Sequence, residues 1–183
     1  MIAKNSEIIY ILEDATNIMF NWLDSEESNQ NKNVCVRHFF EVNVEKHMRE
    51  CLKEAKKAFE KNEIPVGAII VKNNKVIAKN HNRKEKTKSI FDHAEMLCIK
   101  TAIKKSGDWR LNDCLLFVTL EPCLMCLGSI IECRIKKIYI SASKQTYSEE
   151  IKKILKKEKI EVEYGLLKNE SEILLKSFFK NKR

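Results

Sequence analysis

The chain has little glycine and proline, with four and two residues among 183. So few flexible or chain-breaking residues argue against long flexible linkers. No apolar run approaches the roughly 20 residues that a membrane-spanning helix needs, so we expect no membrane span. The N-terminus lacks the basic start and the cleavage site of a signal peptide. Seven cysteines, an odd number, point to a reducing compartment, and we expect a cytoplasmic protein.

The charge of the chain is unevenly distributed along its length. Residues 1–45 hold three Lys or Arg against eight Asp or Glu, whereas residues 46–183 hold 31 basic against 18 acidic residues. Hydrophobic residues make up 44% of the chain, which is enough for the core of one ordinary domain. We therefore expect an acidic, partly helical extension with a linker over 1–45, followed by a basic domain over 46–183.

The extension is predicted from a broad apolar stripe at helical spacing between Ile8 and Leu23. A polar stretch over 24–33 follows and is typical of a linker. The stripe would pack on the domain or on a partner. As an alternative, the acidic segment would cover a basic substrate surface of the domain.

One helix of the domain is expected to begin at a histidine and a glutamate. Asp92 is a good N-cap, and apolar residues recur at helical spacing after it. His93 and Glu95 would then lie in the first turn. Asp92 to Glu95 also fits a capping box, in which Glu95 would only bond back to the main chain.

A second helix is expected to begin at a pair of cysteines. The apolar, β-branched run over 114–120 predicts a strand, and Pro122 suits the first position of the helix that follows. Cys123 and Cys126 would lie three residues apart on one face, near a helix N-terminus whose dipole favours thiolates. A lone pair at this spacing also fits a thioredoxin-like redox site, but that chemistry gives no role to His93.

One histidine and two cysteines are the ligand count of a catalytic zinc site. Zinc takes about four ligands, and a catalytic site leaves one of them to water, whereas a structural site needs a fourth protein ligand. We expect His93, Cys123 and Cys126 to bind one Zn²⁺ per subunit, with Glu95 as a free carboxylate that moves protons. Cys133 is close enough along its helix to be checked as a further ligand. A histidine buried in a core is the alternative for His93 taken alone.

The spacing His-x-Glu followed by Pro-Cys-x-x-Cys is the signature of zinc nucleobase deaminases. Over roughly residues 46–140 the chain resembles the tRNA adenosine deaminases of the TadA type. The segments that carry this resemblance are Ile64-Pro65-Val66-Gly67-Ala68, Asn82-Arg83, His93-Ala94-Glu95, Trp109-Arg110-Leu111 and the run Leu116-Phe117-Val118-Thr119-Leu120-Glu121-Pro122-Cys123. The resemblance implies a three-layer α/β/α cytidine deaminase-like fold with a mixed five-stranded sheet, a zinc-dependent deaminase domain over 46–183, and a homodimer.

The resemblance also implies a function, the hydrolytic deamination of adenosine to inosine at the wobble position of tRNA, with the anticodon loop as partner. Asn82 matches the family asparagine that contacts the target nucleoside. Phe178, Phe179, Lys182 and Arg183 match a Phe-Phe-basic tail that touches the anticodon stem-loop. Aromatic residues in such a helix are also typical of a core.

The remaining patterns alternate between helix and strand, which indicates an α/β layered fold. The expected elements are a helix over 44–61, a hairpin of strands over 66–71 and 76–81, a basic loop over 83–88, a helix over 124–133, a strand over 137–141, a helix over 150–157, a strand over 160–164 and a last helix from about 170.

Other functions are compatible with the same motifs. A deaminase of a free base or nucleoside, guanine or cytosine, would use the same zinc site, and a deaminase acting on DNA is also open. A catalytically silent subunit of a heterodimer would usually lack the glutamate found at Glu95. Salt dependence separates these classes, because RNA binding weakens steeply as salt rises and binding of a small neutral base does not.

Overall fold

The computed structural model describes residues 29–144, 148–180 and 182, and describes side chains from residue 44 onward. Residues 43–183 form one compact unit. The predicted helix between Ile8 and Leu23 and the first part of the predicted linker, 24–28, lie outside the described residues. Within the described ranges, no helix is long and apolar enough to span a bilayer.

Helix α2 (Asn29–Glu60) begins earlier than the predicted start at residue 44. Its first residues, 29–33, were expected to belong to a linker, so this part of the prediction is wrong. The physical reason is that neither proline nor glycine occurs between residues 29 and 60, so nothing in the chain ends the helix in that direction.

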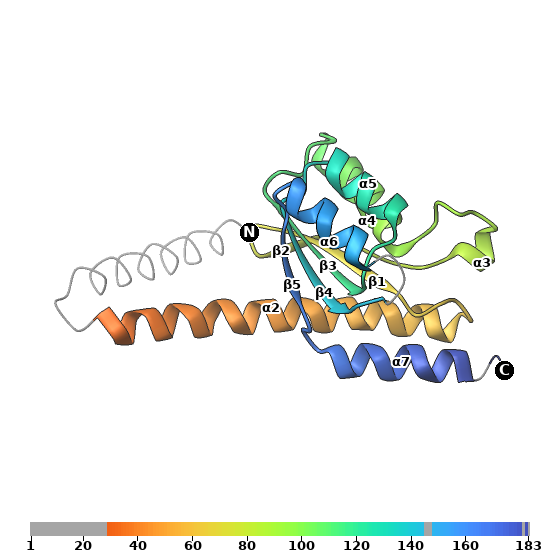
Figure 1. Ribbon diagram of the computed structural model, residues 1–183, viewed down its shortest axis with the longest axis horizontal. Coiled ribbons are helices and arrows are strands. Elements are labelled where there is room, and N and C mark those ends of the chain that lie inside the picture. Colours follow the sequence, from red (N-terminus) through yellow and green to blue (C-terminus); the bar gives the residue numbers. More distant parts are fainter. Residues whose placement is uncertain (1–28, 145–147, 181, 183) are drawn as a thin grey trace, which may run out of the picture. The chain divides into compact units, whose positions relative to one another are not determined.

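A mixed five-stranded sheet with the order β2-β1-β3-β4-β5 lies at the centre of the described part of the compact unit (Figure 1). β1 pairs antiparallel with β2 and β3, whereas β3 with β4 and β4 with β5 are parallel. The strands are β1 (Gly67–Lys72), β2 (Lys75–His81), β3 (Cys114–Leu120), β4 (Lys137–Ala142) and β5 (Glu161–Tyr164). The predicted α/β fold with a mixed five-stranded sheet is therefore confirmed.

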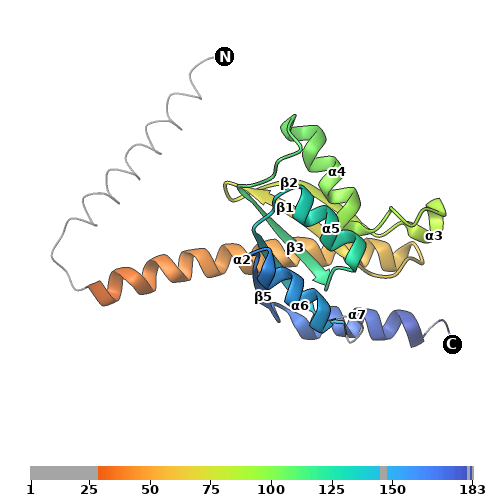
Figure 2. The ribbon, with the colours of Figure 1, turned by 45° about the horizontal axis from the view of Figure 1, so that its top comes forward.

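Helices cover both faces of this sheet, which gives the three layers expected (Figures 1 and 2). The two parallel connections contain helices, as parallel pairing requires. One face carries α4 (Ala94–Ser106), α5 (Leu124–Glu132) and α6 (Ser148–Lys157). The other face carries the part of α2 within the unit and α7 (Lys168–Lys180).

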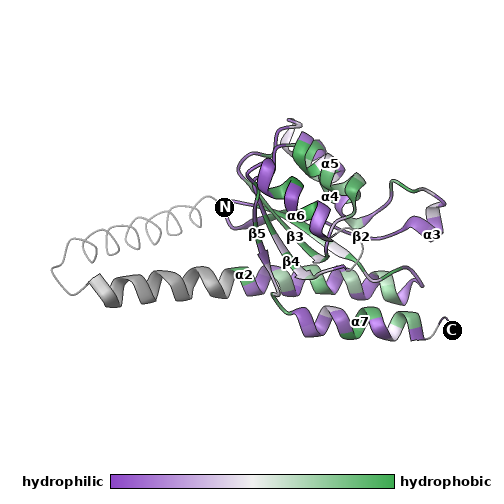
Figure 3. Cartoon of the chain, in the orientation of Figure 1, coloured by the Kyte–Doolittle hydropathy of each residue, from purple (hydrophilic) through white to green (hydrophobic). Residues whose placement is uncertain are grey.

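Alternate residues of the central strands contribute to two separate cores. Ile70 and Leu116 belong to the core beneath α4 and α5. Ile69 and Phe117, which are adjacent to these residues in their strands, belong to the core beneath α2, where Met48 is fully buried. A sheet covered on both faces needs apolar residues pointing both ways, which explains why the neighbouring strands β1 and β3 are apolar along most of their length (Figure 3).

The predicted hairpin is confirmed and closes with a tight turn. Asn73 and Asn74 have φ angles of 48° and 59°, in the left-handed region. Two successive residues of positive φ are the requirement of a type I′ turn, and asparagine tolerates that conformation better than most residues. The elements after residue 90 begin and end within about two residues of the predicted bounds, apart from the helix start discussed with the site.

The segment predicted as a basic loop over 83–88 contains the one-turn helix α3 (Lys84–Thr87). The main-chain N–H groups of Glu85 and Lys86 donate to the carboxylate of Glu63, at 3.0 and 2.6 Å. A carboxylate that accepts from the first N–H groups of a helix stabilises its start. Glu63 lies more than 20 residues away in the chain, so the local sequence pattern could not predict this turn.

Gly67 is the point of closest approach between α2 and the sheet. A Cβ atom added there would lie 2.2 Å from the carbonyl oxygen of Cys51 and 2.6 Å from the amide nitrogen of Ala55. Both are main-chain atoms, so neither moves without shifting α2. The Cys51 thiol also donates to the Gly67 carbonyl oxygen at 3.1 Å, which marks the same close contact.

We predict that Gly67→Ala lowers the free energy of unfolding by about 2 kcal/mol or more, because the methyl group forces α2 away from β1. Urea unfolding followed by circular dichroism measures this loss. Gly128→Ala, on α5 where an added Cβ meets no atom within 4 Å, is the matched control. It should be neutral or stabilising by about 0.5–1 kcal/mol. Equal stability of Gly67→Ala and the wild type would contradict the packing argument.

Candidate metal centre

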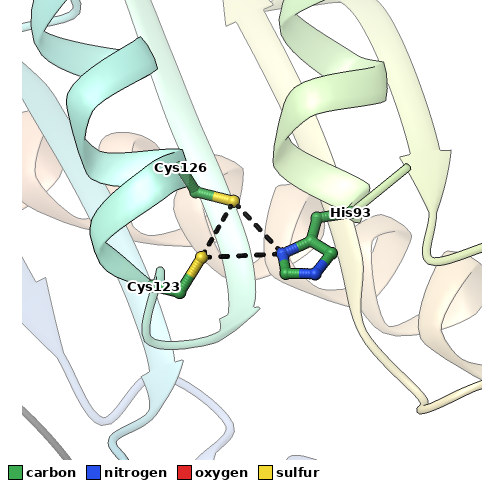
Figure 4. A group of neighbouring side chains, drawn as sticks. All are labelled: His93, Cys123 and Cys126. Atoms are coloured by element: carbon green, nitrogen blue, oxygen red, sulfur yellow. Dashed lines mark hydrogen bonds between the residues drawn. The ribbon is translucent and has the colours of Figure 1, made fainter. Parts of the chain in front are cut away.

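His93, Cys123 and Cys126 come together although 30 residues separate the histidine from the cysteines (Figure 4). Nδ1 of His93 lies 3.6 Å from Sγ of Cys123 and 3.5 Å from Sγ of Cys126, and the two Sγ atoms are 3.6 Å apart. All three ligand atoms lie within 4.8 Å of one another. In the described part of the chain, neither Cys133 nor Glu95 belongs to this group.

The group is formed by two helix N-termini. His93 is the N-cap of α4, with φ −69° and ψ 153°, and Cys123 is the N-cap of α5, with φ −78° and ψ 170°. Both residues have extended backbone, and their side chains point toward each other from the ends of their helices. Cys126 lies in the first turn of α5 and is fully buried.

The predicted starts of these helices are each too early. Asp92 was expected to cap α4, but its carbonyl oxygen accepts a hydrogen bond from the Arg83 N–H at 3.0 Å, and the chain remains extended as far as His93. The capping box from Asp92 to Glu95 is therefore not formed. Pro122 was expected at the first helical position of α5, but it precedes the N-cap. The Glu121 N–H donates to the Ala142 carbonyl oxygen at 2.8 Å, which extends the strand pairing up to this point.

Contacts among the three donor groups shift their pKa values. The hydrogen bond from the Cys126 thiol, together with the contact to His93, lowers the pKa of Cys123 to about 3. The same contact and burial raise the pKa of Cys126 above its usual range. The contact with Cys123 raises the pKa of His93. A thiolate beside an imidazole and a second thiol is a soft N/S donor set, which suits zinc and leaves the fourth tetrahedral position free of protein ligands.

A cavity of about 540 Å³ is lined by one of the three donor residues, His93. Its walls are mostly apolar, with a few polar and charged side chains that include Glu95. Glu95 is 4% exposed, and burial raises its pKa above the usual value of a carboxyl group. The lining residues are Ile64, Val66, Asn82, Lys84, His93, Ala94, Glu95, Leu120, Glu121, Lys144, Leu175 and Phe179.

Only some of the substrate-binding residues expected from the sequence line this cavity. Asn82 and Phe179 line it. Phe178 does not; it is 4% exposed and packs edge-on against Phe59, with ring centroids 6.2 Å apart. Lys182 places its Nζ 4.7 Å from the Phe178 ring centroid. Arg183 lies outside the described residues.

Glu121 is a cavity residue that the sequence analysis did not single out. Its carboxylate is completely buried and accepts hydrogen bonds from the Lys144 N–H at 2.9 Å and the Tyr164 hydroxyl at 3.0 Å. The Ser148 hydroxyl donates at 3.4 Å. The available signal was an acidic residue at the end of an otherwise apolar strand. Glu121 thus connects β3, the segment after β4, α6 and β5 beside the metal-binding group.

The family model for the cytidine and deoxycytidylate deaminase zinc-binding region matches residues 42–142. The chain is 41% identical over 145 residues to the tRNA-specific adenosine deaminase of Bacillus subtilis, which covers 76% of this chain and 90% of the relative. A solved structure from work on A-to-I editing by tRNA:A34 deaminases matches with a TM-score of 0.66 and 33% identity, covering 70% of this chain and 98% of that one. Guanine deaminase from Nitrosomonas europaea shares the fold, with a TM-score of 0.67 and 22% identity over 73% of this chain and 83% of that one.

The family match extends over more than half of the chain and contains all three donor groups as well as Glu95. The B. subtilis relative is aligned along nearly all of its length, so the likeness is not confined to the metal-binding motifs. The chain therefore belongs to the cytidine and deoxycytidylate deaminase family of zinc-binding proteins, in the branch that contains the tRNA-specific adenosine deaminases.

Proposed function

We propose that the chain is a zinc-dependent hydrolase that converts adenosine to inosine at the wobble position of tRNA. The observation that carries this proposal is the 41% identity to a tRNA-specific adenosine deaminase along 90% of that relative's length. The basic composition of residues 46–183 supports an RNA substrate, because cations near the binding site neutralise phosphates. Lys84 and Lys144 line the cavity and provide such charge beside the metal-binding group.

One zinc ion per subunit would be held by His93, Cys123 and Cys126. Their donor atoms are close enough to share one ion, and three protein ligands are the number found in catalytic rather than structural sites. Bound zinc supplies Lewis acidity, which makes water nucleophilic at neutral pH. Cys126 is buried and His93 and Cys123 are half-buried, and His93 lines the cavity in which a substrate would bind.

Glu95 is proposed as the catalytic acid and base. It accepts a proton from the attacking water, whose oxygen bonds to C6 of the adenine ring, and passes this proton to N1. It then accepts the second proton, from the hydroxyl now on C6, and passes it to the exocyclic amine. The C6–N bond breaks as the C6 carbonyl forms, and ammonia leaves with inosine as the product. Burial, which raises the pKa of Glu95, suits this role because the group must both take up and release protons near neutral pH.

Substrate binding is proposed to involve Asn82 and Phe179. Asn82 offers an amide, with both donor and acceptor atoms, to the cavity. Phe179 is 51% exposed and lines the same cavity, so its ring is available for stacking on an unpaired base. Lys182 and Arg183 follow in the chain and would contact the RNA backbone. Phe178 supports this end of α7 from within the core.

We also propose a homodimer formed through α4 and α5. A shallow, largely apolar groove lies between these helices, with Trp109 44% exposed and Leu124 45% exposed. Exposed aromatic and aliphatic side chains around an apolar groove are typical of protein interfaces.

The six cysteines that the structure describes, Cys51, Cys98, Cys114, Cys123, Cys126 and Cys133, are free thiols, which supports a cytoplasmic location.

We predict that Cys123→Ala loses most of its zinc while remaining folded, because two protein ligands bind the ion much more weakly than three. Zinc per subunit is measured by plasma mass spectrometry after dialysis against a weak chelator. Cys133→Ala, which removes a buried thiol of the same segment outside the donor group, is the control and should retain the metal. Unchanged zinc in Cys123→Ala would remove this residue from the ligand set.

We predict that the wild type deaminates an anticodon stem-loop RNA with adenosine at the first anticodon position. Its rate at low RNA concentration should fall steeply as salt rises, because the affinity for RNA falls. Glu95→Gln should retain zinc but lose about 100- to 10,000-fold in turnover, because proton transfer is removed. Inosine is quantified by mass spectrometry of digested RNA, with guanine, cytosine and cytidine assayed in parallel for ammonia release. Turnover of a free base without turnover of RNA would overturn the tRNA assignment and leave the deaminase assignment intact.

We predict that Leu124→Glu converts the dimer to a monomer, because a charge in an apolar interface is left without a partner. Sedimentation velocity at micromolar concentration measures the change in mass. Ile173→Glu is the matched control, since Ile173 is 64% exposed on α7, away from this groove. A wild type that sediments as a monomer, or a Leu124→Glu variant that retains the dimer mass, would refute this interface.

A further inference from the structure

Glu63 is a buried carboxylate with an unusual set of partners. It follows the end of α2 and is only 1% exposed. Oε1 accepts from the Lys86 N–H at 2.6 Å, and Oε2 accepts from the Glu85 N–H at 3.0 Å and from Nδ2 of Asn82 at 3.3 Å. Burying a carboxylate is unfavourable unless hydrogen bonds replace its water. Here that replacement comes from one short segment, residues 82–86.

These partners determine which way the amide of Asn82 faces. A main-chain N–H can only donate, so both oxygens of Glu63 act as acceptors. The atom of Asn82 that faces Oε2 is therefore its NH₂ group, because an amide oxygen could not donate to this acceptor. The hydrogen bond to Glu63 thus defines the orientation of the amide. The carbonyl oxygen Oδ1 has no hydrogen-bond partner among the described residues, and Asn82 lines the cavity. An acceptor atom is thus left available to a bound molecule.

The same carboxylate fixes the start of α3. The N-cap of α3, Arg83, makes no side-chain hydrogen bond to the helix, and Glu63 accepts from the N–H groups of the first turn instead. This turn carries Lys84, which lines the cavity. One buried side chain therefore holds both an uncharged polar group and a cation at the cavity rim.

We propose that Glu63 is a positioning residue for substrate binding, an inference that rests on the proposed function. It holds the Asn82 amide so that Oδ1 accepts a hydrogen bond from a donor group of the target nucleotide, and it holds Lys84 beside that nucleotide. Glu63 does not itself line the cavity, so its effect passes through these two residues. Its chemical requirement is two acceptor oxygens, which glutamine of nearly the same shape does not provide.

The first test is the kinetics of Glu63→Gln on the stem-loop RNA. We expect KM to rise about 10-fold with little change in kcat, since an interaction made equally in the ground and transition states is lost. Zinc content should be unchanged. Glu60→Gln, which alters an exposed glutamate near the same helix end, is the matched control and should leave KM unchanged. An unchanged KM in Glu63→Gln would overturn the proposal.

A mutant cycle in the Asn82→Ala/Lys84→Ala background separates positioning from general support of the fold. If Glu63 acts through Asn82 and Lys84, the effect of Glu63→Gln on KM largely disappears in that background. If Glu63 serves only stability, the effect persists in full, and the proposal is wrong. Should Glu63→Gln fail to fold, Glu63→Asp takes its place in the same cycle, because it keeps the acceptor oxygens but shortens their reach.

A readout independent of activity distinguishes failure of this inference from failure of the proposed function. Hydrogen exchange of the main-chain amides of Glu85 and Lys86 and of the side-chain amide of Asn82 is followed by NMR. We expect exchange at all three to accelerate about 10-fold in Glu63→Gln. A wild type that produces no inosine would refute the tRNA function alone, whereas unchanged exchange would overturn the role of Glu63 whatever the activity.

Discussion

The metal-binding group depends on two helices that begin side by side, each preceded by one residue in extended conformation. His93 and Cys123 cap α4 and α5 without forming side-chain capping bonds, so their ring nitrogen and thiol remain available. Parallel pairing of β3 with β4 and packing of α4 on β1 and β2 place these helix starts at the same end of the sheet. The cores on both faces of the sheet are therefore what keeps the donor atoms within 4.8 Å.

The three donor groups affect one another's protonation. The contacts that lower the pKa of Cys123 also raise the pKa values of Cys126 and His93, so the three groups compete for protons. A divalent ion satisfies all three donors together and releases protons as it binds. The positive ends of α4 and α5 add to this stabilisation of negative charge. The same two helix ends thus position the donor groups and favour a thiolate at Cys123.

The sequence predicted the sheet and the donor residues because both follow from local patterns. Strands buried on two faces are mostly apolar. The two cysteines of the Cys-x-x-Cys motif lie close together whether the helix begins at Pro122 or at Leu124. The helix starts themselves were wrong at Asp92 and Pro122, because long-range hydrogen bonds are made at these points instead: Asp92 accepts from Arg83, and Glu121, just before Pro122, donates to Ala142 of β4. Phe178 and Phe179 could not be separated by type; a helix turns by about 100° per residue, so one ring enters the core and its neighbour reaches the cavity.

Three buried glutamates surround the cavity region, and their partners separate scaffold from chemistry. Glu63 and Glu121 each accept three hydrogen bonds from the protein, which bind their oxygens to neighbouring segments. Glu95 lines the cavity, and burial raises its pKa. Both oxygens of Glu63 and of Glu121 are occupied by these donors, which leaves them poorly placed to exchange protons with a bound molecule. Residue type alone does not distinguish the three, and it is the distribution of donors around them that supports the proposed role of Glu95 as the acid and base.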